Sequence, residues 1–268
     1  MKKSSKYVNK IRSTNVYDVA LKSPITKAVG LSLQYGNNIL LKREDMQPVF
    51  SFKLRGAYNK LSKLHKKGIT KPVFAASAGN HAQGVAFASL KLGLKATIVM
   101  PVTTPSIKID SVKRLGAKVI LQGDNFDEAF KFGKDLAKKK KATFIHPYDD
   151  PDVIAGQGTI GMEILDALDS NIDSIFVPVG GGGLLAGVGA YVKSINPKIK
   201  IYGVEPEDAA CLDAAVKANK RVSLKEVGLF ADGVAVKQIG KTTYSLIEEW
   251  IDGVVTVSVD EICAAVQD

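Results

Sequence analysis

The sequence has few cysteines and histidines and no long apolar run. Its two cysteines, Cys211 and Cys263, lack paired spacing, which excludes a disulfide framework and fits a reducing compartment. Its three histidines, His65, His81 and His146, offer no ligand spacing, so no metal site is predicted. No stretch approaches the roughly 18 apolar residues of a membrane span, and the basic start has no signal-peptide core. The sequence therefore predicts a soluble, cytoplasmic protein.

The sequence is strongly basic, with a formal net charge of +10. The basic residues are scattered, apart from the run at 138–141 and the N-terminus, and they lack interleaved aromatic residues. No helix-turn-helix, zinc-finger or RNA-binding signature accompanies them. We therefore predict a lysine-rich surface and no nucleic-acid partner.

The order of the segments predicts an α/β fold with parallel-rich sheets flanked by helices. Short apolar strands alternate with amphipathic helices from about residue 37 to residue 206, and this alternation is typical of parallel sheets. Two separate glycine-rich turns indicate two sheets. We expect a larger lobe of residues 1–53 and 151–268 and a smaller inserted lobe of residues 54–150. The expected helices lie within 51–68, 79–93, 104–116, 125–141, 156–168 and 183–195.

Four consecutive glycines, Gly180 to Gly183, stand between a strand and a helix in "IFVPVGGGGLLAGVGA". Glycine lets backbone N–H groups approach an anion closely, and the start of a helix supplies unpaired donors and a positive dipole end. The alternative is a tight turn without a ligand, but four glycines lose much backbone entropy on folding. The loop therefore predicts phosphate binding.

The phosphate could belong to a dinucleotide. Gly181, Gly183 and Ala186 fit a loose G-x-G-x-x-A pattern, and Glu205 ends the next strand where an acid would hold a ribose. An NAD-dependent oxidoreductase is therefore one alternative. It leaves unexplained both Lys53 and the turn described next.

A second strand–turn–helix lies in "VFAASAGNHAQGVAFA", with Ser77, Gly79, Asn80 and His81 at the turn. Free N–H groups and the Ser77 hydroxyl could bind a carboxylate there, and Asn80 could donate to a ring oxygen. The alternative is that Ser77 or Asn80 only caps the helix. Carboxylate binding and helix capping are compatible, because both use the free donors at this turn.

Lys53, in "PVFSFKLRGAYNK", follows an apolar run and begins a helical pattern. A phosphate-binding loop, a carboxylate-sized turn and a lysine at a turn are the parts of a pyridoxal phosphate site. The cofactor aldehyde condenses with an uncharged lysine amine, which a desolvated pocket favours. The lysine can then move the substrate α-proton.

Six segments together resemble the biosynthetic threonine dehydratases (threonine ammonia-lyases), pyridoxal-phosphate enzymes of fold type II, the tryptophan-synthase-β-like fold. They are "SFKLRGAYNK", "SAGNHAQGVA", "PVGGGGLLAGV", "GVEPEDAACLDAA", "VGLFADGVAV" and "ICAAVQD", and the likeness runs from about residue 15 to the end. The resemblance implies that Lys53 bonds the cofactor and abstracts the α-proton, with Phe52 beside the ring and Asn80 on its oxygen. It also implies a phosphate site of Gly180, Gly181, Gly182, Gly183 and Leu184, and a substrate carboxylate site of Ser77, Asn80 and His81.

The implied reaction converts L-threonine to 2-oxobutanoate and ammonia, the first step towards isoleucine, with L-serine as a slower substrate. Ala78 stands where serine racemases carry a second serine that acts as a base, so racemisation is disfavoured. Ala209, Ala210 and Cys211 follow Glu205 where those racemases have an aspartate, so no divalent metal site is expected.

The resemblance also bears on the chain's extent and assembly. Family catalytic domains continue beyond Asp268, so we expect the larger lobe to be incomplete, without the isoleucine-sensing module. A homo-oligomer, dimer or tetramer, is expected of the full-length form. A cofactor-binding but inactive chain is a further alternative.

Overall fold

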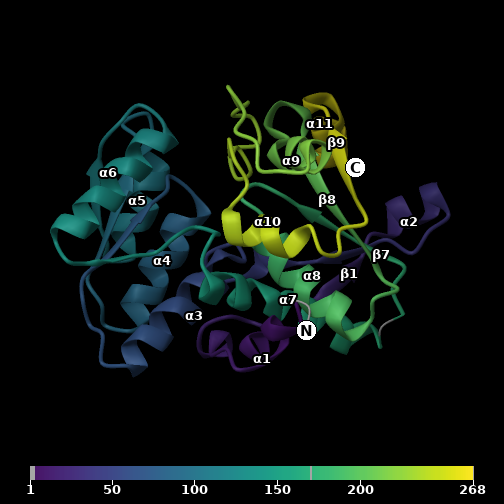
Figure 1. Ribbon diagram of the computed structural model, residues 1–268, viewed down its shortest axis with the longest axis horizontal. Coiled ribbons are helices and arrows are strands. Elements are labelled where there is room, and N and C mark those ends of the chain that lie inside the picture. The colour runs from purple at the N-terminus through teal and green to yellow at the C-terminus, as the bar shows by residue number, and fades with distance from the viewer. Residues whose placement is uncertain (1–3, 170, 268) are drawn as a thin grey trace. The chain divides into compact units, whose positions relative to one another are not determined.

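The computed structural model describes residues 4–169 and 171–267 and shows an α/β protein (Figure 1). Its contacts divide the chain into two compact units. The first unit comprises the described residues of Met1–Arg12, Lys22–Glu44 and Gly158–Asp268, and the second comprises Ser13–Leu21 and Asp45–Gln157.

The second unit is built on a four-stranded parallel sheet of order β5-β4-β3-β6. Side chains alternate between its two faces, as a pleated strand requires. Ala75 and Ile98 face a core shared with α3, α4 and α5, whereas Ala76 and Val99 pack with Ala129 of α6. The strands are β3 (Val73–Ala76), β4 (Ala96–Met100), β5 (Lys118–Leu121) and β6 (Thr143–Phe144). The helices are η1 (Val16–Asp18), α3 (Lys53–Lys66), α4 (Asn80–Lys91), α5 (Ser106–Arg114) and α6 (Phe126–Lys139), with the first turns of α7 (Pro151–Leu168).

The first unit holds a three-stranded parallel sheet of order β7-β8-β9 and a two-stranded antiparallel sheet of β1 and β2. Helix α8 is apolar along its length and is buried almost throughout, and α1 and α10 pack against it. The strands are β1 (Ile25–Lys27), β2 (Leu40–Lys42), β7 (Ser174–Pro178), β8 (Lys200–Pro206) and β9 (Gly253–Val257). The remaining helices are α1 (Ser5–Arg12), α2 (Val29–Tyr35), α8 (Gly183–Ile195), η3 (Glu207–Ala209), α9 (Cys211–Ala218), α10 (Lys241–Ile247) and α11 (Val259–Gln267). The short helix η2 (Glu44–Met46) has its first residue in this unit and the other two in the second.

The predicted fold class is confirmed, and every strand and helix expected between residues 37 and 206 is present. Helix α7 begins five residues earlier than expected, at Pro151, because the Asp150 carboxylate accepts hydrogen bonds from the N–H groups of Asp152 (2.8 Å) and Val153 (3.3 Å). Proline at the first helical position is a common helix start.

The boundaries of the two contact-defined units differ from the lobes expected from the sequence. Residues 13–21 and 45–53 belong to the second unit, since η1 packs against α3 and the Tyr58 hydroxyl bonds Asp18 at 3.0 Å. The start of α7 belongs there too, because a Cβ on Gly156 would lie 2.6 Å from the carbonyl oxygen of Arg55. Within the described residues, no helix is both long and apolar enough to cross a bilayer.

Candidate active site

Lys53 is the first residue of α3, and its amine lies against an aromatic ring and a backbone carbonyl. The Ser51 hydroxyl accepts a hydrogen bond from the Lys53 N–H at 3.2 Å, and the Phe52 ring centroid lies 5.2 Å from Nζ. Nζ donates to the carbonyl oxygen of Pro147 at 3.3 Å, and within residues 4–169 and 171–267 no carboxylate pairs with it. Desolvation lowers the pKa of Lys53 to about 8 from 10.5.

This shift makes Lys53 a reactive amine. Lowering its pKa from 10.5 to about 8 increases the uncharged fraction at neutral pH by roughly 300-fold, since each unit is a factor of ten. A desolvated amine that is not paired with a carboxylate is what covalent chemistry with an aldehyde requires.

Two neutral histidines lie near this amine. His81, which is 3% exposed, directs Nε2 at the carbonyl oxygen of Ile145 at 3.1 Å, so this nitrogen carries the proton. Burial and then the charge of Lys53 lower the pKa of His81 to about 3. Burial also lowers the pKa of His146 to about 4. The environment thus keeps both rings uncharged beside Lys53.

The turn before α4 leaves its donors open. The N-cap residue is Gly79, and no side chain caps the helix, so neither Ser77 nor Asn80 acts as the cap that the sequence allowed. The Ser77 hydroxyl instead accepts from the Gly79 N–H at 3.2 Å, and Asn80 is exposed. The first N–H groups of α4 therefore have no intrahelical acceptor. These donors can receive an anion.

The turn is held close to the reactive lysine. A Cβ placed on Gly84, one turn into α4, would lie 2.9 Å from the carbonyl carbon of Lys53. Helices α3 and α4 are the most extensively packed pair of helices in this unit. The predicted residues Phe52, Lys53, Ser77, Asn80 and His81 therefore all belong to one unit.

The glycine loop lies in the first unit and ends at α8. Gly182, with φ +84°, is the N-cap of this helix, and no side chain caps it. In the described part of the chain, the N–H groups of residues 181–184 have no hydrogen-bond acceptor. The Gly181 carbonyl accepts a hydrogen bond from the buried Thr243 hydroxyl at 2.8 Å. The loop thus presents four backbone donors at a helix start, and a phosphate group fits them.

Glu205 and Cys211 form a buried pair close to Gly180 of this loop. The Glu205 carboxylate is fully buried and accepts from the N–H groups of Leu212 and Asp213, each at 2.9 Å, so it caps the start of α9. The Cys211 sulfur lies 3.4 Å from the carbonyl oxygen of Gly180, and burial raises the pKa of its thiol. The structure thus uses the Glu205 carboxylate as a buried helix cap, which does not favour the ribose-binding role that the NAD alternative gave it.

Each of these two groups of residues, taken by itself, fits one part of pyridoxal phosphate. The second unit supplies a desolvated amine and a turn with open donors, and the first supplies a four-donor loop for the phosphate. Phe52, Lys53, Ser77, Asn80, His81 and residues 180–184 keep the roles proposed for them as predictions. His146 is a polar neighbour of Lys53 that the sequence analysis considered only as a metal ligand.

A pH-dependent stability is expected from Glu205. Burial raises its pKa to about 7 from 4.5, so the folded state keeps a proton that the unfolded state releases. Stability should therefore fall as the pH rises through this window. We expect wild type to lose stability relative to Glu205→Gln, whose amide oxygen can still cap α9, between pH 5 and 8 in urea unfolding. Parallel pH profiles would contradict this.

Comparison with known proteins identifies the class that this fold and these residues define. The chain belongs to the family described as "Pyridoxal-phosphate dependent enzyme", whose family model matches residues 16–268. Pyridoxal phosphate is the cofactor of this family, and the expected family and cofactor are confirmed. This membership removes the NAD alternative.

The chain is also similar to proteins whose names are more specific than the family description. The chain is 58% identical over 262 residues to threonine dehydratase 1 biosynthetic, chloroplastic, of Solanum lycopersicum, covering 98% of this chain and 43% of that protein. It is 51% identical over 268 residues to the L-threonine dehydratase biosynthetic IlvA of Burkholderia multivorans, covering 99% and 53%. It thus spans about half the length of these relatives. The processed form of threonine deaminase isoform 2 from Solanum lycopersicum superposes with a TM-score of 0.95 at 50% identity, covering 98% of this chain and 77% of that one.

Proposed function

We propose that this chain is the catalytic part of a pyridoxal-phosphate-dependent threonine ammonia-lyase. It converts L-threonine to 2-oxobutanoate and ammonia: one water is lost from the substrate and one is regained on hydrolysis, so the atoms balance. The single observation that carries the proposal is the desolvated Lys53 amine, which pairs with no carboxylate of the described residues, in a chain 58% identical to a threonine dehydratase.

Lys53 is the proton-transfer residue in this proposal. Its lowered pKa, about 8, supplies the free amine needed first to hold the cofactor and then to take the α-proton of threonine. When bound, the cofactor supplies an electron-withdrawing ring that makes this proton acidic. His81 and His146 are both kept neutral by burial, so neither places a charged imidazolium beside the Lys53 amine.

The turn before α4 binds the substrate carboxylate in this proposal. The open N–H groups at the start of α4 and the Ser77 hydroxyl are the donors. The His81 ring is engaged with the Ile145 carbonyl, so its contribution comes from its backbone N–H. The exposed Asn80 amide is free to donate to the cofactor's ring oxygen.

The glycine loop binds the cofactor phosphate. The N–H groups of residues 181–184 supply four donors at the positive end of α8, and this combination is favourable for a dianionic group. Removing the phosphate from the cofactor should therefore weaken binding much more than changing its ring.

Several finer assignments belong to the same proposal. L-serine is the slower substrate, and the product supplies isoleucine synthesis. We infer a cytoplasmic enzyme and a homo-oligomeric full-length form, dimer or tetramer.

Steady-state kinetics of the purified chain with added pyridoxal phosphate test the proposal. We expect equal amounts of 2-oxobutanoate and ammonia from L-threonine, with a kcat/KM higher than that for L-serine. Epimerised or racemised amino acid without ammonia would point to a racemase. Binding of cofactor without either product would favour the inactive alternative and overturn the proposed activity.

A further inference from the structure

The segment from Ile145 to Asp150, between β6 and α7, contacts Lys53 at the start of α3 and His81 at the start of α4. The Ile145 carbonyl faces the His81 ring at 3.1 Å, and the Pro147 carbonyl accepts from Lys53 Nζ at 3.3 Å. Pro147 is also buried. Both contacts come from the backbone, so the position of the Lys53 amine depends on the path of this segment.

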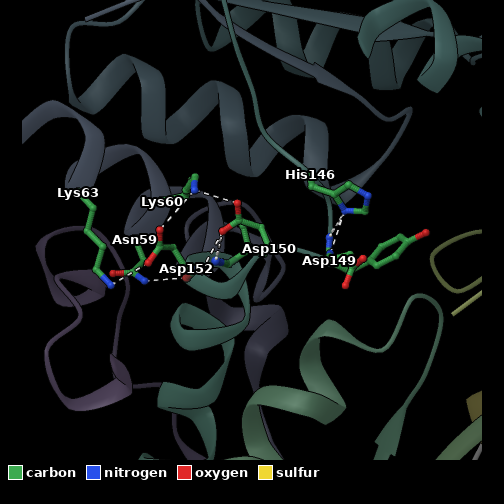
Figure 2. A network of polar contacts seen from close by, with 9 residues as sticks. Asn59, Lys60, Lys63, His146, Asp149, Asp150 and Asp152 are labelled. Atoms are coloured by element: carbon green, nitrogen blue, oxygen red, sulfur yellow. Dashed lines mark hydrogen bonds and ion pairs between the residues drawn. The ribbon is translucent and has the colours of Figure 1, made fainter. Parts of the chain in front are cut away.

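One side chain fixes that path. The Nδ1 atom of His146 accepts hydrogen bonds from the N–H groups of Tyr148 at 3.3 Å and Asp149 at 2.9 Å, closing a turn over Pro147 (Figure 2). The His146 ring packs edge-on against Phe130 of α6 at 5.3 Å and against Tyr148 at 4.7 Å between centroids. Aromatic pairs in this arrangement are favourable. The ring is thus held between α6 and the turn that it closes.

The far end of the segment is anchored separately. Asp150 caps α7 with one carboxylate oxygen, and its other oxygen pairs with Lys60 of α3 at 2.8 Å (Figure 2). Asn59 of the same helix donates to the Asp152 carbonyl at 2.6 Å. Because α3 begins at Lys53, the segment is attached at this end to the helix that carries the amine. At the near end the Ile145 N–H donates to the Phe74 carbonyl at 2.8 Å, and His146 adds a side-chain anchor after it.

The hydrogen bonds of His146 show which ring nitrogen carries the proton. An Nδ1 that accepts from two backbone N–H groups must be unprotonated, so the neutral ring carries its hydrogen on Nε2. The charged groups that face it are Lys53 and Lys134, which lower its pKa, and Asp149 and Asp150, which raise it. With its pKa lowered to about 4, the ring stays an acceptor at neutral pH.

We propose that His146 is a positioning residue for Lys53: by accepting the Tyr148 and Asp149 N–H groups, it holds the Pro147 carbonyl against the amine and keeps water from it. The inference rests on the role proposed for Lys53. Without the Nδ1 acceptor the turn opens and water reaches Nζ. Desolvation lowers the pKa of Lys53, so we expect the entry of water to raise this pKa by more than the loss of the neutral hydrogen bond to Pro147 changes it.

Asparagine is a close chemical substitute for the hydrogen-bond acceptor of His146. In asparagine the side-chain oxygen is attached to Cγ, as Nδ1 is in histidine, and asparagine commonly accepts from N–H groups two residues further on. His146→Asn should therefore keep the turn. His146→Leu removes the acceptor, and His146→Gln places its oxygen one bond too far.

The experiment measures the pKa of Lys53 in the cofactor-free chain, by trace labelling with acetic anhydride from pH 6 to 11 and mass spectrometry of the Lys53 peptide. The exposed Lys67 is the internal reference, and His65→Leu, at an exposed histidine of α3, is the matched control. We expect wild type, His146→Asn and His65→Leu to share one profile. His146→Leu should shift it upwards by at least one pH unit, so that labelling at pH 7.5 falls about tenfold.

Backbone amide exchange of the peptide that contains Tyr148 and Asp149 reports the turn itself, and it should be faster only in His146→Leu. Faster exchange with an unchanged Lys53 profile would overturn the proposal, as would a His146→Asn shift equal to that of His146→Leu. If His146→Leu does not fold, His146→Gln takes its place with the same expected results. Labelling needs neither cofactor nor threonine, so a chain without lyase activity would disprove the proposed function and leave this test intact.

Discussion

Replacing Lys53 with alanine is expected to lower kcat/KM for L-threonine by about ten-thousandfold or more. The substitution removes the amine that binds the cofactor and moves the α-proton, and positioned proton transfer alone contributes up to about 10⁴. Because Lys53 has no carboxylate partner within the described residues, no buried charge is left unpaired. The free energy of unfolding should therefore change little, and the loss should appear in 2-oxobutanoate formation.

Lys67→Ala is the matched control, since Lys67 is an exposed residue at the end of the same helix. It should retain wild-type kinetics. Activity of Lys53→Ala within tenfold of wild type, in a folded protein, would show that another group takes the α-proton.

Gly182→Ala is expected to weaken binding of pyridoxal phosphate at least tenfold. Gly182 has φ +84°, and a Cβ there would lie 2.8 Å from the Ile239 side chain and 3.1 Å from the Thr243 hydroxyl. That hydroxyl holds the Gly181 carbonyl, so accommodating the methyl group must move the loop and its donors. Titration with cofactor can be followed by the fluorescence of Trp250, the only tryptophan, which packs against Gly189 of α8.

Gly36→Ala separates backbone strain from the loss of the phosphate site. Gly36 also has a positive φ, +61°, but a Cβ there meets nothing within 4 Å. Both substitutions should cost about 1 kcal/mol of stability through strain, and only Gly182→Ala should weaken cofactor binding. Equal affinity in the two variants would contradict the assignment of this loop to the phosphate.

Local sequence signals predicted most of the fold because they coincide with tertiary packing. The strand predicted within residues 71–77 is a short apolar run that is buried throughout in the parallel sheet, and the helix ended by Gly93 buries its apolar residues beside it. Strand β2 was predicted, but β1 and its antiparallel pairing with β2 were not, since β1 has only three residues and α2 lies between the two strands. The start of α7 was misplaced by five residues, although Asp150 followed by Pro151 is a recognisable helix start.

The candidate site was predictable in its glycine loop and its lysine, whose residue types and spacing carry the chemistry. Glu205 was misread because sequence shows a carboxylate but not its burial, and the structure uses it to cap α9. The contribution of His146 was missed for a similar reason. Its two acceptor bonds are local, but their importance lies in the contact of Pro147 with Lys53, 94 residues away along the chain.

The claim that Lys53 carries the cofactor is tested most directly by borohydride reduction of the chain loaded with pyridoxal phosphate, followed by peptide mapping. Reduction fixes the bond between cofactor and amine, and mass spectrometry locates it. We predict one modified lysine per chain, at Lys53, and no such label in Lys53→Ala. Modification at another lysine, or label spread over many lysines, would contradict the assignment of Lys53 as the cofactor-binding residue.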